Sequence, residues 1–390
     1  MIYVHVPFCG SFCTYCDFYS EIARSPEVRD RYVKDICAEA ARRQEEIRRT
    51  LDVRTLYLGG GTPSVLPLSC LEQIVRAVDA GPYEEFTVEV NPEDIVCGGP
   101  EYVRGLLGLG VNRISMGVQS LDDGMLRWMD RRHNAATARR AWRILREAGV
   151  SNGSVDVIFG ISHLTDEVLE RTVAEILDWG PEHVSAYQLS IEPGSELAQL
   201  CVQGRYREAS EDQCAGQYRL LCRLLGQAGY RHYEISNWAR PGREAVHNSA
   251  YWSRAAYVGL GPGAHSFDGK GHRSWNSEVL CGWKPETEVL DAAAERTERI
   301  MLALRTDRGI ALSELPPEPA ARLLQAGALE HLPADLTQEY LPSGRSQEHL
   351  TSDRALERYP SGLRNTRPSD RVRIPEDRWF VSDEIIAELI

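Results

Sequence analysis

The sequence predicts an α/β fold with a central parallel sheet, followed by a small appended domain. Over roughly the first 240 residues, short apolar runs alternate with longer amphipathic ones six times, and no tandem hairpins interrupt them. This alternation is typical of strand–helix units whose parallel strands share one sheet, with helices outside it. After about residue 285 the pattern changes. The pattern alone does not separate an open, doubly wound sheet from a full or partial barrel.

The six predicted strands are short and apolar, and several are rich in β-branched residues. They are Ile2–Val6, Thr55–Leu58, Phe86–Val90, Arg113–Val118, Gly153–Phe159 and His183–Ile191. The helices carry apolar residues at helical spacing. They are Glu27–Arg48, Leu71–Val78, Tyr102–Leu107, Ala135–Ala148, Asp166–Trp179 and Asp212–Ala228. Because ligands of parallel sheets bind at the carboxyl ends of the strands, we expect the chemistry on the loops that follow them.

The appended domain is predicted from four short elements. Glu286–Thr306 is expected to be one helix, and Leu312–Leu332 adds a short helical stretch. Pro333–Pro368 is polar and turn-rich, which is typical of a loop or a disordered insertion. The chain then ends in a predicted hairpin and a helix. The hairpin comprises Arg371–Ile374 and Trp379–Val381, and the helix is capped by Ser382 with Asp383 and Glu384 in its first turn.

Composition excludes several classes of protein. No apolar run approaches the roughly 18 residues of a membrane span, and the first residues lack the basic segment and long apolar core of a signal peptide. We therefore expect a cytoplasmic protein. The net charge of −13 argues against a nucleic-acid partner, which needs basic surface to neutralise phosphates.

Three of the ten cysteines lie within eight residues. Cys9, Cys13 and Cys16 form C-x3-C-x2-C directly after the first strand, whereas the other seven are scattered as small buried residues would be. In a reducing compartment such a cluster indicates a metal site. Iron–sulfur cubanes normally take four cysteines, so three leave one iron open for a reaction. Zinc with His5 as fourth ligand, or fortuitous clustering, are the alternatives.

The C-x3-C-x2-C loop resembles the signature of the radical S-adenosylmethionine (SAM) superfamily, and Tyr15 before the last cysteine suits it. This resemblance implies a 4Fe–4S cluster whose open iron is chelated by the amino and carboxylate groups of SAM. It also implies that an electron from the cluster cleaves SAM to methionine and a 5′-deoxyadenosyl radical. The superfamily's GGGTP stretch, which holds the amino group of SAM, corresponds here to residues 59–63.

Polar residues stand near the ends of four successive strands. Glu89, Gln119, Asp156 and Ser190 each lie at or near the functional end of a predicted strand. A lone one would be an ordinary loop residue, but four in series indicate a binding site. Arg131 and Arg132 lie between them, and a guanidinium binds a carboxylate bidentately.

Further stretches resemble the HemW/HemN group, over roughly Met1–Thr306. They include residues 3–9, 110–115, 117–120, 187–194, 233–237 and 259–267. The resemblance implies a (β/α)6 partial TIM-type barrel with a small C-terminal helical, winged-helix-like domain. It divides the chain into a radical SAM core (1–240), an extension packed on that core (241–285) and the C-terminal domain (286–390). By the same likeness the SAM pocket is lined by Tyr3, Tyr15, Gly60, Gly61, Thr62, Glu89, Gln119, Arg131, Asp156 and Ser190.

Within this group, the chain resembles the HemW branch. The oxidase branch has a further cysteine two residues after the third, where this chain has Phe18, and an extension before the first strand, which here begins at residue 2. His247-Asn-Ser-Ala-Tyr251-Trp252 fits the HNxxYW pattern of HemW-like proteins. The resemblance implies that His247, Tyr251 and Trp252 associate with haem, since histidine is a usual axial ligand and aromatic rings pack on a porphyrin. The alternative is a structural, hydrogen-bonded histidine.

Three functions remain open. The first is a haem chaperone that passes haem to an acceptor protein, such as a respiratory, membrane-associated one. The second is an oxygen-independent coproporphyrinogen III oxidase, and the third is a radical SAM enzyme acting on RNA, which the charge disfavours. The implied cofactors are the cluster, SAM and haem, with flavodoxin or ferredoxin as electron donor. A monomer or weak homodimer is expected, and no catalytic residue is assigned.

Overall fold

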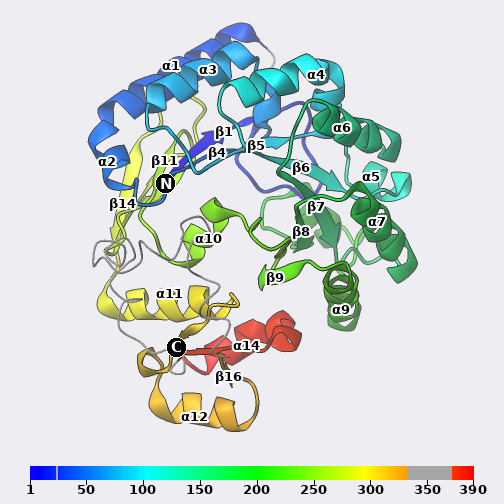
Figure 1. The fold of residues 1–390 in the computed structure, drawn as a ribbon, viewed down its shortest axis with the longest axis vertical. Helices are drawn as coiled ribbons and strands as arrows, with labels where there is room; N and C mark the ends of the chain where they lie inside the picture. Colours follow the sequence, from blue (N-terminus) through cyan, green and yellow to red (C-terminus); the bar gives the residue numbers. More distant parts are fainter. Residues whose placement is uncertain (23–24, 333–370) are drawn as a thin grey trace, which may run out of the picture. The chain divides into compact units, whose positions relative to one another are not determined.

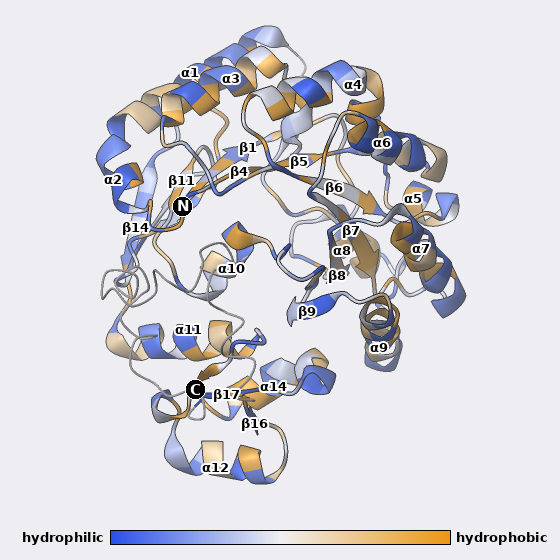
Figure 2. Cartoon of the chain, in the orientation of Figure 1, coloured by the Kyte–Doolittle hydropathy of each residue, from blue (hydrophilic) through white to orange (hydrophobic). Residues whose placement is uncertain are grey.

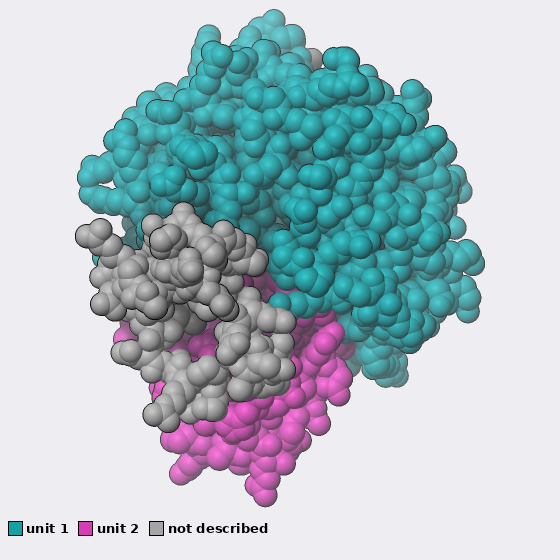
Figure 3. All heavy atoms as spheres, in the orientation of Figure 1, with its two compact units in different colours: residues 1–231, 236–247, 256–289 teal, residues 232–235, 248–255, 290–390 magenta. Residues whose placement is uncertain are grey.

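The computed structural model describes residues 1–22, 25–332 and 371–390 (Figure 1). The chain divides into two compact units, which Figure 3 colours separately. The first comprises residues 1–231, 236–247 and 256–289, and the second comprises residues 232–235, 248–255 and 290–390. The predicted insertion at Pro333–Pro368 lies outside the described residues. No helix among the described residues is both long and apolar enough to cross a membrane.

The predicted parallel sheet is confirmed in the first unit. Its parallel strands follow the order β11-β1-β4-β5-β6-β7-β8, and β10 pairs antiparallel with β8. The six predicted strands correspond to β1 (Ile2–Val6), β4 (Thr55–Gly60), β5 (Glu85–Val90), β6 (Arg113–Gln119), β7 (Gly153–Phe159) and β8 (His183–Gln188). β8 therefore ends before the predicted Ile191, and Ser190 lies in the loop that follows.

Helices cover the convex side of this sheet (Figure 1). They are α1 (Pro26–Arg42), α2 (Gln44–Arg49), α3 (Leu68–Val78), α4 (Pro92–Gly108), α5 (Asp123–Trp128), α6 (Ala135–Glu147), α7 (Asp166–Trp179) and α9 (Glu211–Gln227). The short α8 (Glu196–Val202) instead lies against the cysteine loop, where the Leu197 N–H donates to the Thr14 carbonyl at 2.9 Å. Their buried residues recur at helical spacing, as Ala138, Ala141, Trp142 and Leu145 do on α6. Figure 2 shows the resulting hydrophobic and hydrophilic sides of α6 and α7.

The first predicted helix is divided in two. Arg43 has φ −102° and ψ 15°, so it separates α1 from α2 instead of continuing one helix to Arg48. Its guanidinium donates to the Gly259 carbonyl (2.8 Å) and to the Ser266 hydroxyl (3.0 Å). These contacts with a distant part of the chain explain why local periodicity did not reveal the break.

The segment after the predicted core forms further strands. β11 (Val258–Leu260) pairs parallel with β1, and β12 (His265–Phe267), β13 (His272–Asn276) and β14 (Pro285–Val289) form a small antiparallel sheet. The prediction of one helix from Glu286 to Thr306 is therefore wrong at its start. The helix α11 spans Ala292–Leu304, and the Asp291 side chain caps it by accepting from the Ala294 N–H.

In the second unit, short strands accompany the helices. β15 (Ile310–Ala311), β17 (Arg371–Arg373) and β16 (Glu330–His331) pair antiparallel in that order, beside α12 (Pro317–Gln325) and α14 (Ser382–Ala387). The predicted hairpin is wrong, because Glu376–Val381 is a 3-10 helix and β17 pairs with strands from elsewhere. Ser382 is the first residue of α14 and not its cap, although Asp383 and Glu384 do occupy the first turn.

Several short elements lie between the main ones. β9 (Arg231–Glu234) crosses the boundary between the units, as does α10 (Val246–Trp252), while β10 spans Asn237–Ala239. The cysteine loop carries β2 (Phe8–Cys9) and β3 (Glu21–Ile22), which pair parallel with each other.

Candidate cofactor site

The central strands are buried except at a few positions. In each of β1, β4, β5, β6 and β7, only one or two residues keep part of their surface accessible. These residues are Tyr3, Tyr57, Gly60, Glu89, Gly117, Gln119 and Asp156. Most of them are polar, and neighbouring strands supply them in turn. The structure thus gathers a partly accessible row of polar groups across the sheet, which is what a polar ligand requires.

The cysteine loop follows β1 directly. Cys9, Cys13 and Cys16 are all partly exposed, and the Cys16 N–H donates to the Cys13 carbonyl at 3.1 Å. Burial raises the pKa of the Cys9 thiol and raises that of Cys16 to about 11. These two thiols are therefore protonated at neutral pH without a metal, and metal binding must displace their protons.

The geometry disfavours the zinc alternative. A tetrahedral Zn²⁺ with Zn–S bonds near 2.3 Å holds its sulfurs about 3.8 Å apart. Among the described residues, these three thiols do not belong to any group whose ligand atoms lie within 4.8 Å of one another. His5 is also committed elsewhere, because its Nε2 lies 2.8 Å from the Tyr19 carbonyl and its Nδ1 lies 3.1 Å from the Tyr3 hydroxyl. A multinuclear cluster, which spreads its thiolates more widely, fits this loop better than a single ion.

A chain of hydrogen bonds connects two of the thiols. Arg131 Nη1 lies 3.3 Å from Cys13 Sγ, and Arg131 Nη2 donates to Asn91 Oδ1 at 2.6 Å. The Asn91 amide donates to Thr62 Oγ1 at 3.0 Å, and that oxygen lies 3.6 Å from Cys9 Sγ. The Arg131 Nε is buried and has no hydrogen-bond partner among the described residues. This donor fits an anionic ligand beside the cysteine loop.

The glycines at the end of β4 allow a backbone conformation and close contacts that a side chain would prevent. Gly60 has φ +107°, and a Cβ there would lie 2.5 Å from the His5 ring. A Cβ on Gly61 would lie 2.8 Å from the Phe8 carbonyl oxygen. The Gly61 and Thr62 N–H groups donate to the carbonyls of Val6 (2.9 Å) and Phe8 (2.7 Å), so this turn is bonded to the base of the cysteine loop.

Two carboxylates stand on the neighbouring strands. Glu89 Oε2 accepts from the Gly60 N–H at 3.1 Å, and burial raises the pKa of Glu89 to about 7. Burial also raises the pKa of Asp156, whose carboxylate accepts from the Ser115 hydroxyl at 3.2 Å. A cationic ligand between the two carboxylates would favour their charged forms.

The remaining residues predicted for the SAM pocket are spread around this row. Gln119 ends β6 at φ +66°, where the register with β7 shifts, and such bulges redirect side chains beside functional sites. Tyr15 is close to Arg131, 3.5 Å from its Nη1, and burial raises the pKa of this phenol. Ser190 is exposed in the loop after β8, and among the described residues it makes no hydrogen bond to the others.

Sequence reasoning missed two residues that the structure brings into the site. Asn91 bridges Arg131 and Thr62, and Tyr57 donates its hydroxyl to Glu89 Oε1 at 2.7 Å. Tyr57 lies two residues before Gly59 on β4, and Asn91 lies two residues after Glu89, directly past the end of β5. That spacing puts residues on the same side of a strand and was the available signal.

The residues predicted to associate with haem occupy different environments. His247 belongs to the first unit, is 1% exposed, and lies with its Nδ1 2.8 Å from Thr55 Oγ1. Burial lowers its pKa to about 3. This geometry favours the structural alternative for His247. Tyr251 and Trp252 belong to the second unit and are half-buried.

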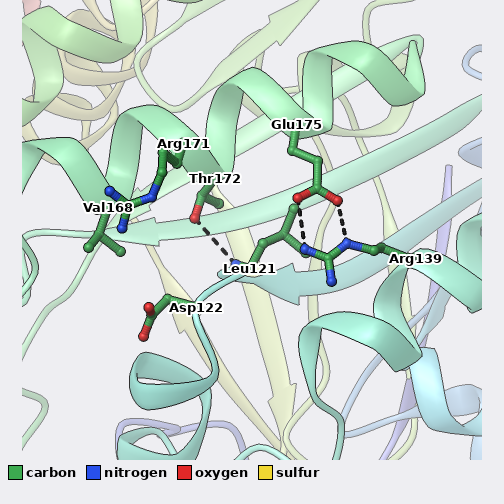
Figure 4. A pocket seen from close by; sticks show the side chains of 7 residues that line it. All are labelled: Leu121, Asp122, Arg139, Val168, Arg171, Thr172 and Glu175. Atoms are coloured by element: carbon green, nitrogen blue, oxygen red, sulfur yellow. Dashed lines mark hydrogen bonds and ion pairs between the residues drawn. The ribbon is translucent and has the colours of Figure 1, made fainter.

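A separate cavity of about 220 Å³ contains none of these residues. In Figure 4 Arg139 and Glu175 point toward each other across it and pair at 2.5 and 2.8 Å. The Thr172 hydroxyl accepts from the Leu121 N–H at 3.3 Å. Two polar pairs that line this cavity are therefore already formed within the protein.

Comparisons with known proteins show the family of this chain. Residues 3–176 match the family model of the radical SAM superfamily. The chain is 35% identical over 352 residues to the haem chaperone HemW of Mycobacterium tuberculosis, covering 85% of this chain and 88% of the relative. It is 32% identical over 334 residues to the haem chaperone HemW of a Synechocystis species, covering 80% of each. The solved coproporphyrinogen III oxidase (HemN) of Escherichia coli has a TM-score of 0.70 at 18% identity, over 99% of this chain and 89% of that one. The structural likeness to this oxidase confirms the predicted α/β fold of the radical SAM type.

Proposed function

Because this chain belongs to the HemW family of radical SAM proteins, we propose that it is a haem chaperone that binds haem and passes it to an acceptor protein. The observation that carries this proposal is its identity with haem chaperones of the HemW family across most of both chains. The absence of a cysteine at position 18 also supports the chaperone over the oxidase. Phe18 stands there, with 67% of its surface exposed.

We propose that Cys9, Cys13 and Cys16 hold a 4Fe–4S cluster with one iron left for SAM. When bound, the cluster supplies the electron that radical SAM chemistry requires. Arg131 is suited to offset thiolate charge beside Cys13, and its buried Nε offers a donor to an anionic ligand group. Glu89 and Asp156 are suited to a cationic group, and the Gly60 N–H holds Glu89 Oε2 in place for it.

We propose that haem contacts the aromatic side chains of Tyr251 and Trp252. Both are half-buried and retain surface for stacking on a porphyrin. His247 is proposed to have a structural role inside the first unit, because its ring is buried and its Nδ1 lies 2.8 Å from the Thr55 hydroxyl. The haem acceptor is proposed to be a respiratory protein at the membrane. The electron donor is proposed to be a flavodoxin or ferredoxin.

The proposed setting is the cytoplasm, because the three closely spaced thiols need a reducing compartment to stay available for iron. No nucleic-acid partner is proposed, since the net charge is −13. A monomer or weak homodimer is proposed as the working state.

A two-part assay tests the proposal. The reconstituted protein should bind haem stoichiometrically in an absorption titration. Incubated anaerobically with SAM, a reductant and coproporphyrinogen III, it should give no decarboxylated product above background by mass spectrometry. Turnover on coproporphyrinogen III without haem uptake would establish the oxidase and reject the chaperone. In the same titration, Tyr251→Ala combined with Trp252→Ala should perturb the haem spectrum.

A further inference from the structure

One side of β4 carries a row of polar groups that reaches the SAM cradle. Thr55, Tyr57 and Gly59 alternate along the strand, so they share one side of it. The Tyr57 hydroxyl donates to Glu89 Oε1 at 2.7 Å, while the Gly60 N–H donates to Glu89 Oε2 at 3.1 Å. Both oxygens of this carboxylate are therefore held, one by a side chain and one by the cradle's own backbone.

The His247 ring packs against the ring of Tyr57. The His247 and Tyr57 ring centroids are 5.0 Å apart at 35°, and His247 Nδ1 lies 2.8 Å from the Thr55 hydroxyl on the same strand. The His247 N–H donates to Glu85 Oε1 at 3.0 Å, so β5 fixes the backbone while β4 fixes the ring. With 1% of its surface exposed, the imidazole has little room to move. Its packing limits the positions that the Tyr57 ring can take.

From this arrangement we infer that Tyr57 and His247 are positioning residues for SAM. Tyr57 orients the Glu89 carboxylate by a hydrogen bond, and His247 holds the Tyr57 ring. The inference rests on the proposed function, in which Glu89 lines the SAM pocket. It assigns the histidine of the HNxxYW stretch to the SAM cradle, whereas the resemblance implied haem.

Tyr57 affects the ionisation of Glu89 as well as its orientation. The groups that face this carboxylate are the Tyr57 hydroxyl, the Gly60 N–H, Asp156 and Arg113. Burial and Asp156 favour the neutral form, whereas the hydroxyl, the backbone donor and Arg113 favour the charged form. Removing the hydroxyl therefore raises the pKa of Glu89 and leaves less carboxylate to meet a cationic group of SAM near neutral pH.

Tyr57→Phe is the sharpest variant because it removes one hydroxyl and keeps the ring against His247. The reconstituted variant should keep its iron content, and SAM affinity by equilibrium dialysis at pH 7 should fall about tenfold, the scale of one buried hydrogen bond. The loss should shrink at pH 8.5, where a larger share of Glu89 is charged in both proteins. Tyr83→Phe is the matched control, since the Tyr83 ring packs on Phe86 at 5.6 Å, away from the cradle. It should leave SAM affinity unchanged.

His247→Ala tests the second residue with a different readout. SAM affinity should fall, the SAM-induced change in the cluster's EPR spectrum should weaken, and the haem absorption spectrum should stay as in the wild type. His232→Ala is the control, because His232 is also buried and its Nδ1 lies 3.1 Å from Glu376 Oε1, but it belongs to the second unit. It should leave SAM affinity unchanged. If His247→Ala fails to fold, Thr55→Val replaces it, since valine removes the partner of Nδ1.

The outcomes separate the inference from the proposed function. Unchanged SAM affinity in both Tyr57→Phe and His247→Ala, with wild-type protein that binds SAM, overturns the inference alone. A His247→Ala protein that loses the haem spectrum but keeps SAM affinity returns His247 to the haem site and also overturns it. Wild-type protein that assembles a cluster but binds no SAM rejects the proposed function itself.

Discussion

At the scale of single residues, the site depends on side chains that hold other side chains. Among the described residues Asn91 makes no hydrogen bond to a cysteine, yet it joins Arg131 to Thr62 and so connects the surroundings of Cys13 and Cys9. Each of these bonds involves a charged or partly buried group, where a hydrogen bond contributes most. The spacing of the cysteine loop therefore does not by itself fix the cluster environment. Thr62 after β4, Asn91 after β5 and Arg131 also contribute to that environment.

The first prediction concerns the thiols. Replacing Cys9, Cys13 or Cys16 by alanine should abolish the four-iron centre after reconstitution, because a cubane with two protein thiolates lacks half of its usual ligands. Iron content and EPR spectra measure this. Cys97→Ala is the control, since Cys97 is an exposed thiol on α4, and it should retain full iron content. An intact cluster in a loop variant would contradict the assignment.

The second prediction concerns the stability cost of Glu89. Its folded pKa of about 7 exceeds the ordinary 4.5, so the folded protein resists ionisation and loses stability as pH rises through this window. Glu89→Gln removes the charge, and the Tyr57 hydroxyl can rotate to accept from the new amide. The cofactor-free variant should be more stable than wild type by about 3 kcal/mol at pH 8 and by about 1 kcal/mol at pH 5. Urea denaturation at both pH values measures this.

A surface glutamate provides the control for Glu89. Glu72 pairs with Arg76 on α3, and both side chains are well exposed, so Glu72→Gln should change stability little at either pH. Equal stability of Glu89→Gln and wild type at pH 8 would mean that burial does not destabilise the charged form of Glu89. The Glu89→Gln variant should also bind SAM more weakly, since it keeps the shape of the side chain but loses its charge.

At the scale of elements, one carboxylate anchors the strands that follow the core. Glu39 on α1 is 3% exposed and accepts from the Gly261 N–H (2.9 Å), the Asn276 amide (2.9 Å) and the Trp283 indole (2.8 Å). Arg43 Nη1 lies 3.3 Å from the same carboxylate. Through Glu39, helix α1 thus fixes the positions of three residues between the start of β11 and the start of β14: Gly261, Asn276 and Trp283. Local sequence around any one of them gives no sign of the others.

The third prediction follows from this anchor. Glu39→Ala should destabilise the first unit by about 3 kcal/mol or more, because it leaves several buried donors and a partly buried guanidinium without their acceptor. Hydrogen exchange should show the loss first in β11, β12 and β13. Glu46→Ala is the control, since Glu46 pairs with Arg43 at the surface and its side chain is 53% exposed. A loss of equal size in the control would contradict the special role of Glu39.

At the scale of the whole molecule, the candidate SAM site belongs to the first unit alone. The cysteine loop, the glycine turn and the row from Tyr3 to Asp156 all lie within residues 1–231, and His247 belongs to the same unit. Ligand binding to one unit raises the stability of that unit by mass action, without acting directly on the other.

The fourth prediction uses this linkage. At a SAM concentration one hundred times its dissociation constant, the reconstituted protein should gain about 2.7 kcal/mol. Hydrogen exchange should show this protection in β4 to β7 and not in α12 of the second unit. Removing SAM by dialysis should reverse it. Equal protection in α12 would mean that the two units respond as one body, and would contradict the assignment of the site to the first unit.

The sequence by itself determined the alternation of strands and helices, the cysteine loop, the glycine turn and the polar ends of β5, β6 and β7. Each of these depends on local periodicity or on residue types at short spacing, which a sequence displays directly. The tertiary structure decided what depends on distant contacts. Arg43 breaks the first helix while bonding to Gly259, β14 forms where helix was expected because β13 pairs with it, and β17 pairs with β15 and β16 and not within a hairpin. It also decided the surroundings of His247: the pattern singled out this histidine, but only the fold brings it against Thr55 and Tyr57, residues almost two hundred positions away.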